Sequence, residues 1–246
     1  MPIVNVDAKS LEWCTYLYLS QDKVGLDEWH GVITDPSQHD IHKANQAAFN
    51  LPSRLVAKVF LFRWIYRGSA FAYSKDPDFM PVSKSQDFWQ DVIDKYYDKY
   101  KQIYKTHMQY IKQATTTGKL TSPFGRQYVF EPKRNKRGEM VWSEPDITNY
   151  PNQGCGADVM AVARVAVFNR LKRAGLTGKL ISTVHDSIVA DVPQQEVEQC
   201  SEIFDKVFRD LPKLVTQAYG VDWNVPMLGE VSVGPNMLEL EEVKFS

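Results

Sequence analysis

The sequence is poor in cysteine and contains no long apolar run. Its 246 residues hold three cysteines, Cys14, Cys155 and Cys200, and no C-x-x-C pair. This number and spacing argue against a disulfide framework or a zinc site and favour a reducing compartment. No run of about 18 apolar residues is present, so we expect no membrane span. The first residues lack the basic-then-apolar pattern of a signal peptide, so we expect the protein in the cytoplasm.

Net charge is also nearly absent. The chain has 29 Lys and Arg residues against 30 Asp and Glu residues, a formal charge of −1, whereas a stand-alone nucleic-acid-binding domain usually carries a basic excess. Positive charge is concentrated in residues 133–137 (KRNKR), shortly after Arg126. Two interpretations of this run stay open, a solvated loop and a local phosphate-binding patch. Either such patches or another chain must provide the main grip on a nucleic acid.

Strand and helix patterns alternate along the chain without an internal repeat or a low-complexity linker. Alternating apolar and polar residues predict a strand at 3–7, and residues 179–192 predict two strands joined at His185 and Asp186. Other patterns predict helices over 10–19, 40–49, 54–66, 88–114, 154–173 and 194–218, a loop at 25–36, a hairpin at 120–130 and a closing strand at 225–233. The aromatic stripe within 88–114 is interpreted as core.

Two aspartates, Asp7 and Asp186, each follow an apolar strand pattern, so each carboxylate should project from a sheet edge. Nucleotidyl transfer from a nucleoside triphosphate uses two metal ions roughly 3.5–4 Å apart. Mg²⁺ usually takes one or two carboxylates together with phosphate oxygens. One aspartate alone would be interpreted as a strand-end cap, but the pair together with the cationic helix expected between them predicts a site for two Mg²⁺ ions, with Mn²⁺ as a substitute. No cysteine or second histidine pair completes a metal site around His30, His39 and His42.

The helix expected at 54–66 places Arg54, Lys58, Phe62 and Tyr66 on one face, because side chains four residues apart are neighbours. Two cations can bind triphosphate oxygens through charge-assisted hydrogen bonds. Two aromatic rings further along can stack on a base and a sugar. An ordinary amphipathic surface helix explains the apolar residues of this segment but not the row of two cations followed by two aromatics.

These motifs resemble those of DNA polymerase family A, the DNA polymerase I type. Residues 7–12 (DAKSLE) resemble its motif A, the row from Arg54 to Tyr66 resembles motif B (R-x3-K-x3-F-x3-Y), and residues 184–186 (VHD) resemble motif C. Between them, residues 40–42 (DIH), 125–126 (GR) and 149–154 (NYPNQG) resemble three further motifs. Each match alone is weak, but six in the family's order cover almost the whole chain and are very specific.

The resemblance implies a role for each matching position. The catalytic and metal-binding positions would be Asp7 and Asp186, the Ala8 carbonyl, and Lys58. The nucleotide-binding positions would be Glu12 as a gate against a ribose 2′-hydroxyl, His42, Arg54 and Lys58 on the triphosphate, Phe62 on the sugar and Tyr66 near the templating base. The DNA-binding positions would be Arg126, Asn149 and Gln153 on the primer–template and His185 near the primer terminus.

The sequence departs from the family pattern at four positions. Ser187 stands where the family has a glutamate after motif C, and Cys14 stands where an arginine usually follows motif A. Arg63 and Arg67 stand where glycines usually flank the turn after motif B. Because Ser187 has no carboxylate, we expect the site to lack the auxiliary acidic group that the glutamate supplies. We expect the two arginines to add positive charge where phosphates pass.

Motif C also resembles that of single-subunit phage RNA polymerases. Glu12 at the gate position argues against that class, and so does Phe62, because those enzymes carry methionine there. The resemblance to family A therefore predicts a template-directed DNA polymerase that uses primer–template DNA and dNTPs. The alternative from another class is a non-catalytic module that binds DNA or a replisome partner.

The resemblance implies an α+β fold with an antiparallel palm sheet and a helical fingers insertion. We expect palm at residues 1–40, fingers at 41–148 and palm again at 149–246. In the family, motif A follows a long region with the exonuclease, the thumb and the first palm strands. Here the residues that resemble motif A begin at Asp7, the seventh residue of the sequence. We therefore expect a second polypeptide to supply thumb and exonuclease, as in a split polymerase of a bacteriophage acting in the host cytoplasm. A fragment of a longer polymerase is the alternative.

Overall fold

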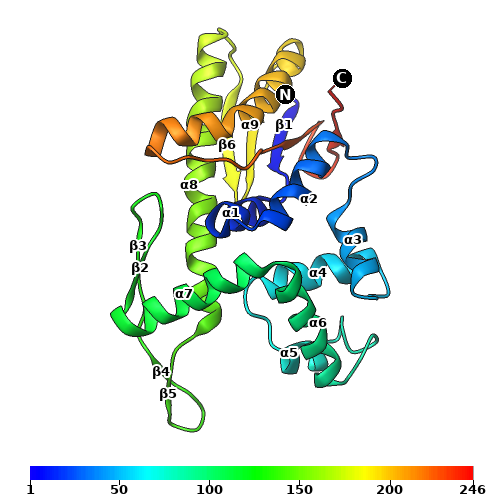
Figure 1. Cartoon of the computed structure of the whole chain (residues 1–246). Coiled ribbons are helices and arrows are strands. Elements are labelled where there is room, and N and C mark those ends of the chain that lie inside the picture. Colours follow the sequence, from blue (N-terminus) through cyan, green and yellow to red (C-terminus); the bar gives the residue numbers. More distant parts are fainter. Residues whose placement is uncertain (246) are drawn as a thin grey trace. The chain divides into compact units, whose positions relative to one another are not determined.

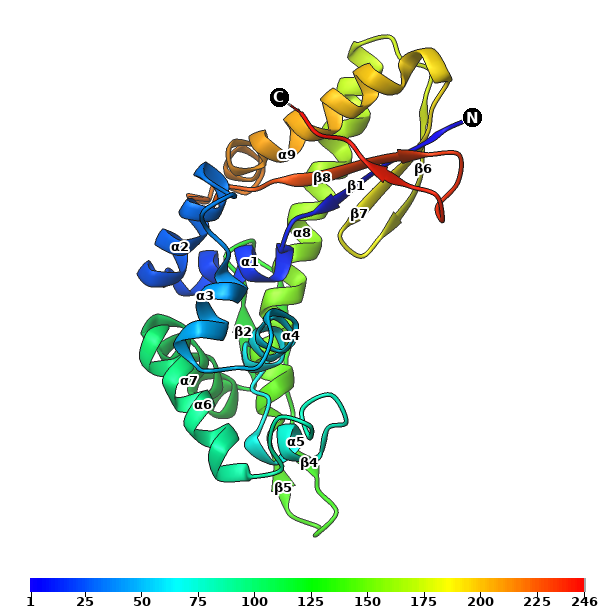
Figure 2. The same ribbon diagram turned by 90° about the vertical axis from the view of Figure 1, so that its right-hand side faces the viewer.

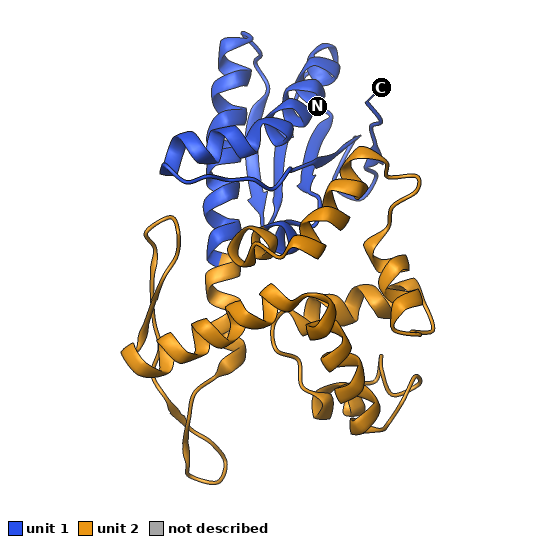
Figure 3. Cartoon of the chain, viewed as in Figure 1, with its two compact units in different colours: residues 1–14, 154–246 blue, residues 15–153 orange. Residues whose placement is uncertain are grey.

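The computed structural model describes residues 1–245 as two compact units. Unit 1 comprises Met1–Cys14 and Gly154–Ser246, and unit 2 comprises Thr15–Gln153 (Figure 3). The first unit carries an antiparallel sheet and the second is mainly helical, which confirms the predicted α+β class. None of the described helices has the length and apolar character needed to cross a bilayer.

Unit 1 is built on a five-stranded antiparallel sheet with the order β6-β7-β1-β8-β9 (Figures 1 and 2). Its strands are β1 (Ile3–Ala8), β6 (Lys179–Val184), β7 (Ser187–Asp191), β8 (Gly229–Gly234) and β9 (Glu241–Glu242). A short 3-10 turn, η1 (Gln194–Glu196), leads into helix α9 (Val197–Tyr219). The two strands expected within 179–192 are confirmed, whereas the closing strand begins at Gly229 rather than at 225.

Helix α9 packs on one face of this sheet, against β1 and β8. Val4 and Val6 of β1 are fully buried. A Cβ at Gly229 would lie 2.5 Å from Val6 Cγ2 and 2.9 Å from Phe208 Cγ of α9, so only glycine permits this close approach. Because side chains alternate along a strand, Asn5 and Asp7 lie on the opposite face from Val6.

Unit 2 consists of helices and two small hairpins. Its helices are α2 (Lys23–Thr34), α3 (Ile41–Ala48), α4 (Arg54–Trp64), α5 (Ala70–Lys75), α6 (Gln86–Lys99) and α7 (Lys101–Thr117). Its hairpins pair β2 (Lys119–Thr121) with β3 (Gln127–Val129) and β4 (Lys133–Arg134) with β5 (Met140–Val141). Helices α1 (Leu11–Ser20) and α8 (Glu144–Arg173) contain residues of both units.

Aromatic side chains form the core of unit 2. Phe60 of α4 stacks on Tyr73 at 4.6 Å and on Trp89 at 5.8 Å between ring centroids. Trp64 lies 5.2 Å from Tyr96, and all five side chains are buried. Trp89 and Tyr96 belong to α6, so for these two residues the interpretation of the aromatic stripe within 88–114 as core is confirmed.

Two sequence predictions about unit 2 were wrong, and Asp22 explains both. Residues 25–36 were expected to be a loop, but α2 occupies most of them because Asp22 Oδ1 accepts a hydrogen bond from Gly25 N at 3.0 Å. Residues 88–114 were expected to be one helix, but the chain breaks at Tyr100. Asp22 Oδ2 accepts from Gln102 N at 2.9 Å and thereby satisfies the start of α7.

The division into units differs from the domain limits expected from the sequence. Residues 15–40 belong to the helical unit rather than to the unit that contains the sheet. Glu28 of α2 accounts for part of this, because it pairs with Lys99 Nζ at 2.6 Å and accepts from Tyr100 OH at 2.8 Å. The second limit, between Gln153 and Gly154, lies close to the expected one.

Candidate active site

Asp7 and Asp186 are brought together in unit 1 by the pairing of β1 with β7. Asp7 lies opposite Ser187, and Ala8 N donates a hydrogen bond to the main-chain oxygen of Asp186 at 2.9 Å. His185 and Asp186 form the two-residue turn between β6 and β7, with His185 at φ +53°. A left-handed residue in a two-residue turn matches the twist of the strands, so the turn fixes the position of Asp186.

The carboxylates on this face of the sheet repel one another. Partial burial, then the charge of Asp186, then that of Glu230 together raise the pKa of Asp7 from 3.8 to about 6. A group whose charged form is disfavoured by both burial and like charges is a candidate for a functional site. A bound cation would relieve this repulsion.

Glu230 is a residue that sequence reasoning missed. It lies directly opposite Asp7 in the pairing of β1 with β8, so both side chains are on the same face of the sheet. Its Oε1 also lies 3.4 Å from Lys9 Nζ. The only signal in the sequence was the alternation of apolar and polar residues through 229–234, because register between distant strands cannot be derived from one sequence.

The donor set at this site suits a hard cation held mostly by its substrate. Among residues 1–245 no three or more His, Cys, Asp or Glu side chains are arranged to hold a metal ion by themselves. Asp7 and Asp186 nevertheless supply the one or two carboxylates that protein-bound Mg²⁺ usually takes when phosphate oxygens provide further ligands. These residues therefore fit Mg²⁺ or Mn²⁺ in a ternary site rather than a closed structural metal site.

Two other predicted site residues also belong to unit 1. Glu12 lies in the first turn of α1 and is partly buried, directly after the buried Leu11. His185 is exposed at the tip of the β6–β7 turn, next to Asp186. Unit 1 thus contains Asp7, Ala8, Glu12, His185 and Asp186 of the predicted set.

Three of the four residues predicted on one helix face, Arg54, Lys58 and Phe62, lie on α4, but the helix ends at Trp64 and not at residue 66, so Tyr66 lies beyond it. Ser53 caps the helix, since its hydroxyl accepts from Val56 N at 3.2 Å. The buried face comprises Ala57, Phe60, Leu61 and Trp64. Arg54 and Lys58 are exposed, and Phe62 is partly exposed on the same side. The aromatic core thus fixes the orientation of the polar row.

His42 is part of the same cluster. Asp40 caps α3 by accepting from His42 N and Lys43 N at 2.9 and 3.0 Å, and its Oδ2 accepts from Arg54 Nε at 2.7 Å. The His42 ring lies 6.2 Å from that of Phe62. Burial and the positive charges of Arg54 and Lys58 lower the pKa of His42 to about 4, although Asp40 opposes this shift. His42 is therefore neutral at pH 7.

Tyr66 lies just beyond α4, and an unforeseen residue positions it. Asn152 of α8 donates from Nδ2 to Tyr66 OH at 3.2 Å and accepts from Thr15 Oγ1 at 2.5 Å. Asn149 and Gln153 flank Asn152 on the same helix, and Asn149 Oδ1 is buried without a hydrogen-bond partner. Motif spacing alone does not indicate that the middle of residues 149–154, rather than their ends, would hold Tyr66.

The remaining predicted residue, Arg126, is exposed in the turn between β2 and β3. It therefore lies on a different element from both α4 and α8. Unit 2 contains His42, Arg54, Lys58, Phe62, Tyr66, Arg126, Asn149 and Gln153 of the predicted set.

Arg63 and Arg67 do not supply the free positive charge that was expected of them. Arg63 is paired with Asp76 and lies 3.7 Å from an oxygen of Asp78. Arg67, at φ +62°, donates to Glu144 and to Tyr97 OH at 3.2 Å. Both arginines are thus neutralised by acidic partners. Their salt bridges connect the end of α4 and the residues after it with Asp76 and with Glu144 of α8.

The other two departures, Cys14 and Ser187, have local structural roles. Burial raises the pKa of the Cys14 thiol far above its ordinary value, so it is not a nucleophile. Ser187 is buried and its hydroxyl donates to Val184 O at 3.0 Å across the β6–β7 turn. Ser187 therefore stabilises the turn that carries Asp186.

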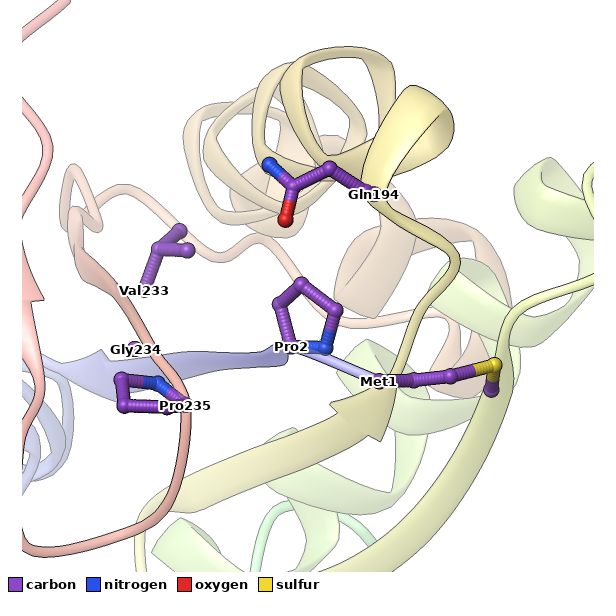
Figure 4. A pocket seen from close by; sticks show the side chains of 6 residues that line it. All are labelled: Met1, Pro2, Gln194, Val233, Gly234 and Pro235. Atoms are coloured by element: carbon purple, nitrogen blue, oxygen red, sulfur yellow. The ribbon is translucent and has the colours of Figure 1, made fainter.

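A separate pocket of about 450 Å³ opens where β1 begins (Figure 4). It is lined by Met1, Pro2, Gln194, Val233, Gly234 and Pro235. None of these side chains ionises, and Asp7 lies five residues along the strand from Pro2, about 17 Å away. This pocket is therefore not part of the candidate active site.

Comparison with known proteins identifies the family. The model of DNA polymerase family A matches residues 18–239, so the chain belongs to DNA polymerase family A. It is 31% identical to DNA polymerase I of Pseudomonas aeruginosa over 95% of its length and 29% identical to DNA polymerase I of Chloroflexus aurantiacus over 82%. It is also 26% identical, over 80% of its length, to a DNA polymerase of Bacillus phage SP01.

The chain is much shorter than these relatives. It spans 24%, 21% and 22% of their respective lengths. Its fold is similar to that of the POL domain of Pol1 from M. smegmatis, solved in complex with DNA primer-template and dNTP. The TM-score is 0.76 at 21% identity, covering 95% of this chain and 39% of that one, which shows a shared fold.

The raised pKa of Asp7 predicts that its charge opposes folding. Because the pKa is about 6 in the folded chain and 3.8 ordinarily, the folded state binds the proton more tightly, so the free energy of unfolding falls as pH rises through this range. We expect Asp7→Asn to be more stable than the unaltered chain in urea unfolding at pH 8 without metal. Mg²⁺ should stabilise the unaltered chain but not Asp7→Asn.

The matched control for this experiment is Asp222→Asn, which removes an exposed carboxylate from the same unit. It should leave both the stability at pH 8 and the response to Mg²⁺ unchanged. Equal stabilisation of all three proteins by Mg²⁺ would contradict the assignment of Asp7 as a metal ligand.

His42 should report on triphosphate binding. Burial, together with the charges of Arg54 and Lys58, holds its pKa at about 4, and a bound triphosphate would offset the two charges. We expect the pKa of His42, followed by NMR of its ring protons, to rise by at least one unit when dATP is added. In Lys58→Ala the pKa without dATP should be higher and the rise smaller. Saturable dATP binding with an unchanged pKa of His42 would contradict this role.

Proposed function

We propose that the chain is the catalytic part of a template-directed DNA polymerase, which transfers a nucleotide from a dNTP to a primer 3′-hydroxyl. The observation that supports this most directly is the coupling of Asp7 and Asp186 on one sheet face, in a chain that belongs to DNA polymerase family A. The cationic face of α4 supports it independently.

In this proposal Asp7, Asp186 and the carbonyl of Ala8 hold two Mg²⁺ ions, for which Mn²⁺ can substitute. When bound, these ions supply stabilisation of the charge on the attacking and leaving oxygens. The chain's own contribution is rigidity, since strand register and the tight β6–β7 turn fix the two carboxylates before substrate binds. This preorganisation lowers the cost of reaching the transition state.

The residues of unit 2 would bind the dNTP. Arg54 and Lys58 would contact the triphosphate oxygens by charge-assisted hydrogen bonds. Neutral His42 would donate a further hydrogen bond and gain a proton as negative charge accumulates. Phe62 would pack on the sugar, and Tyr66, held by Asn152, would face the templating base.

The remaining assignments concern selectivity and DNA. Glu12 would exclude a ribose 2′-hydroxyl, which favours dNTPs over ribonucleotides. Arg126, Asn149 and Gln153 would contact the primer–template. His185, exposed beside Asp186, would lie near the primer terminus.

We further propose that a second polypeptide, carrying the thumb and exonuclease, covers part of unit 1. Among the strands described within residues 1–245, β6 is an edge strand that pairs with β7 alone, and its apolar residues Ile181 and Val184 are more than half exposed. Val165 and Phe168 of α8 are exposed to the same degree. An uncovered edge and exposed apolar side chains favour pairing with another chain.

Primer extension with Mg²⁺ tests both proposals at once. On a primed template with excess trap DNA, the chain alone should add one or a few nucleotides per binding event, because few phosphate contacts hold the duplex. Asp186→Ala should reduce the rate at least a hundredfold, and ribonucleotides should be poor substrates. Glu12→Ala should increase ribonucleotide use.

The outcomes separate the two proposals. Long products from a single binding event of the chain alone would contradict the need for a second polypeptide. Extension that persists in Asp186→Ala would contradict the proposed catalytic site. Binding of primer–template without any nucleotide addition, even at high protein concentration, would favour a non-catalytic DNA-binding module.

A further inference from the structure

The β4–β5 hairpin carries the densest positive charge in the chain. Residues 133–137 contain Lys133, Arg134, Lys136 and Arg137 and no acid, and all four side chains are exposed. Within residues 1–245, the salt bridge described for these four is that of Lys133, whose Nζ lies 3.7 Å from Asp146. Unlike Arg63 and Arg67, three of these cations are not neutralised by neighbours.

The turn that presents them is ordered by its own hydrogen bonds. Asn135 N donates to Glu139 O at 2.9 Å, and Gly138 N donates to Asn135 O at 3.0 Å. Asn135 Oδ1 accepts from Arg137 N and Glu139 N at 2.9 and 3.0 Å. Gly138 adopts φ +83°, which glycine tolerates without strain. A ligand would therefore meet a preformed backbone.

The base of the hairpin is fixed to the body of unit 2. Trp142, just after β5, packs against a buried apolar cluster. That cluster comprises Ala114, Leu120, Phe130 and Ile147. Figure 3 shows the hairpin projecting from the helices of this unit, with its tip away from them. The tip is thus an exposed and cationic arm.

The chemistry of the tip fits phosphate rather than bases. Arg134 and Arg137 offer guanidinium forks that match phosphate oxygens, and the two lysines offer point charges. Its one amide, Asn135, is occupied within the turn. The residues 133–139 include no aromatic ring on which an unpaired base could stack, a feature that single-strand binders use.

We propose that the β4–β5 hairpin is a phosphate-binding arm that contacts the sugar–phosphate backbone of duplex DNA without reading its sequence. This inference rests on the proposed function and extends it, because it assigns part of the DNA grip to a segment outside the family motifs. Each phosphate that the arm neutralises releases condensed counterions and steepens the dependence of binding on salt.

The test is equilibrium binding of the full chain to two unrelated blunt duplexes, measured by fluorescence anisotropy at several salt concentrations. In Lys136→Gln/Arg137→Gln, the slope of log Kobs against log salt should be smaller in magnitude by about 1.8, which corresponds to two lost phosphate contacts. Between 50 and 200 mM salt, the variant should then lose roughly tenfold less affinity than the unaltered chain. Both duplexes should behave alike.

The matched control is Lys75→Gln/Lys84→Gln, which removes two exposed charges from the same unit outside the hairpin. It should keep the slope of the unaltered chain. Equal effects of both double variants, an unchanged slope in the hairpin variant, or competition by an acidic peptide but not by duplex DNA would overturn the inference. So would a lack of duplex binding by the unaltered chain. Hairpin-dependent binding without nucleotide addition would contradict the proposed function alone.

Discussion

Carboxylates that repel one another on one face of the sheet are the dominant electrostatic feature of unit 1. Burial and the charges of Asp186 and Glu230 raise the pKa of Asp7 to about 6. The antiparallel register of β1 with β7 and β8 enforces this proximity, and the packing of Val6 on α9 keeps the register in place. A fold that keeps like charges together at a cost in stability is typical of a site that receives a cation.

In unit 2, a buried aromatic core determines what the exposed side of α4 can bind. Phe60 and Trp64 anchor the helix among stacked rings, which leaves Arg54, Lys58 and Phe62 on the opposite side. Other arginines in the same region are paired with acids and do not compete for an anion. Arg54 of α4 is itself paired with Asp40, but within residues 1–245 no salt bridge is described for Lys58 or for Arg134, Lys136 and Arg137 of the β4–β5 hairpin. Positive charge therefore stays available on these side chains, although the whole chain is nearly neutral.

The sequence predicted the strands around Asp7 and Asp186 and the polar row of α4, because local periodicity and motif spacing determine both. It did not predict Glu230, since register between strands more than 200 residues apart depends on tertiary packing. The helix α2 and the break at Tyr100 were missed for a similar reason: one carboxylate, Asp22, caps two helices that are distant in sequence. The pairing of Arg63 and Arg67 likewise depends on contacts that spacing cannot reveal.

The proposed function requires that Asp7 and Asp186 hold the metal ions and that Arg54 and Lys58 hold the triphosphate of the same nucleotide. Crystals of the chain with primer–template, Mn²⁺ and a non-hydrolysable dNTP analogue would test it most directly, since anomalous scattering locates Mn²⁺. We expect two Mn²⁺ peaks within ligand distance of both carboxylates, with the triphosphate on Arg54 and Lys58. Mn²⁺ bound elsewhere, or a triphosphate away from α4, would contradict it.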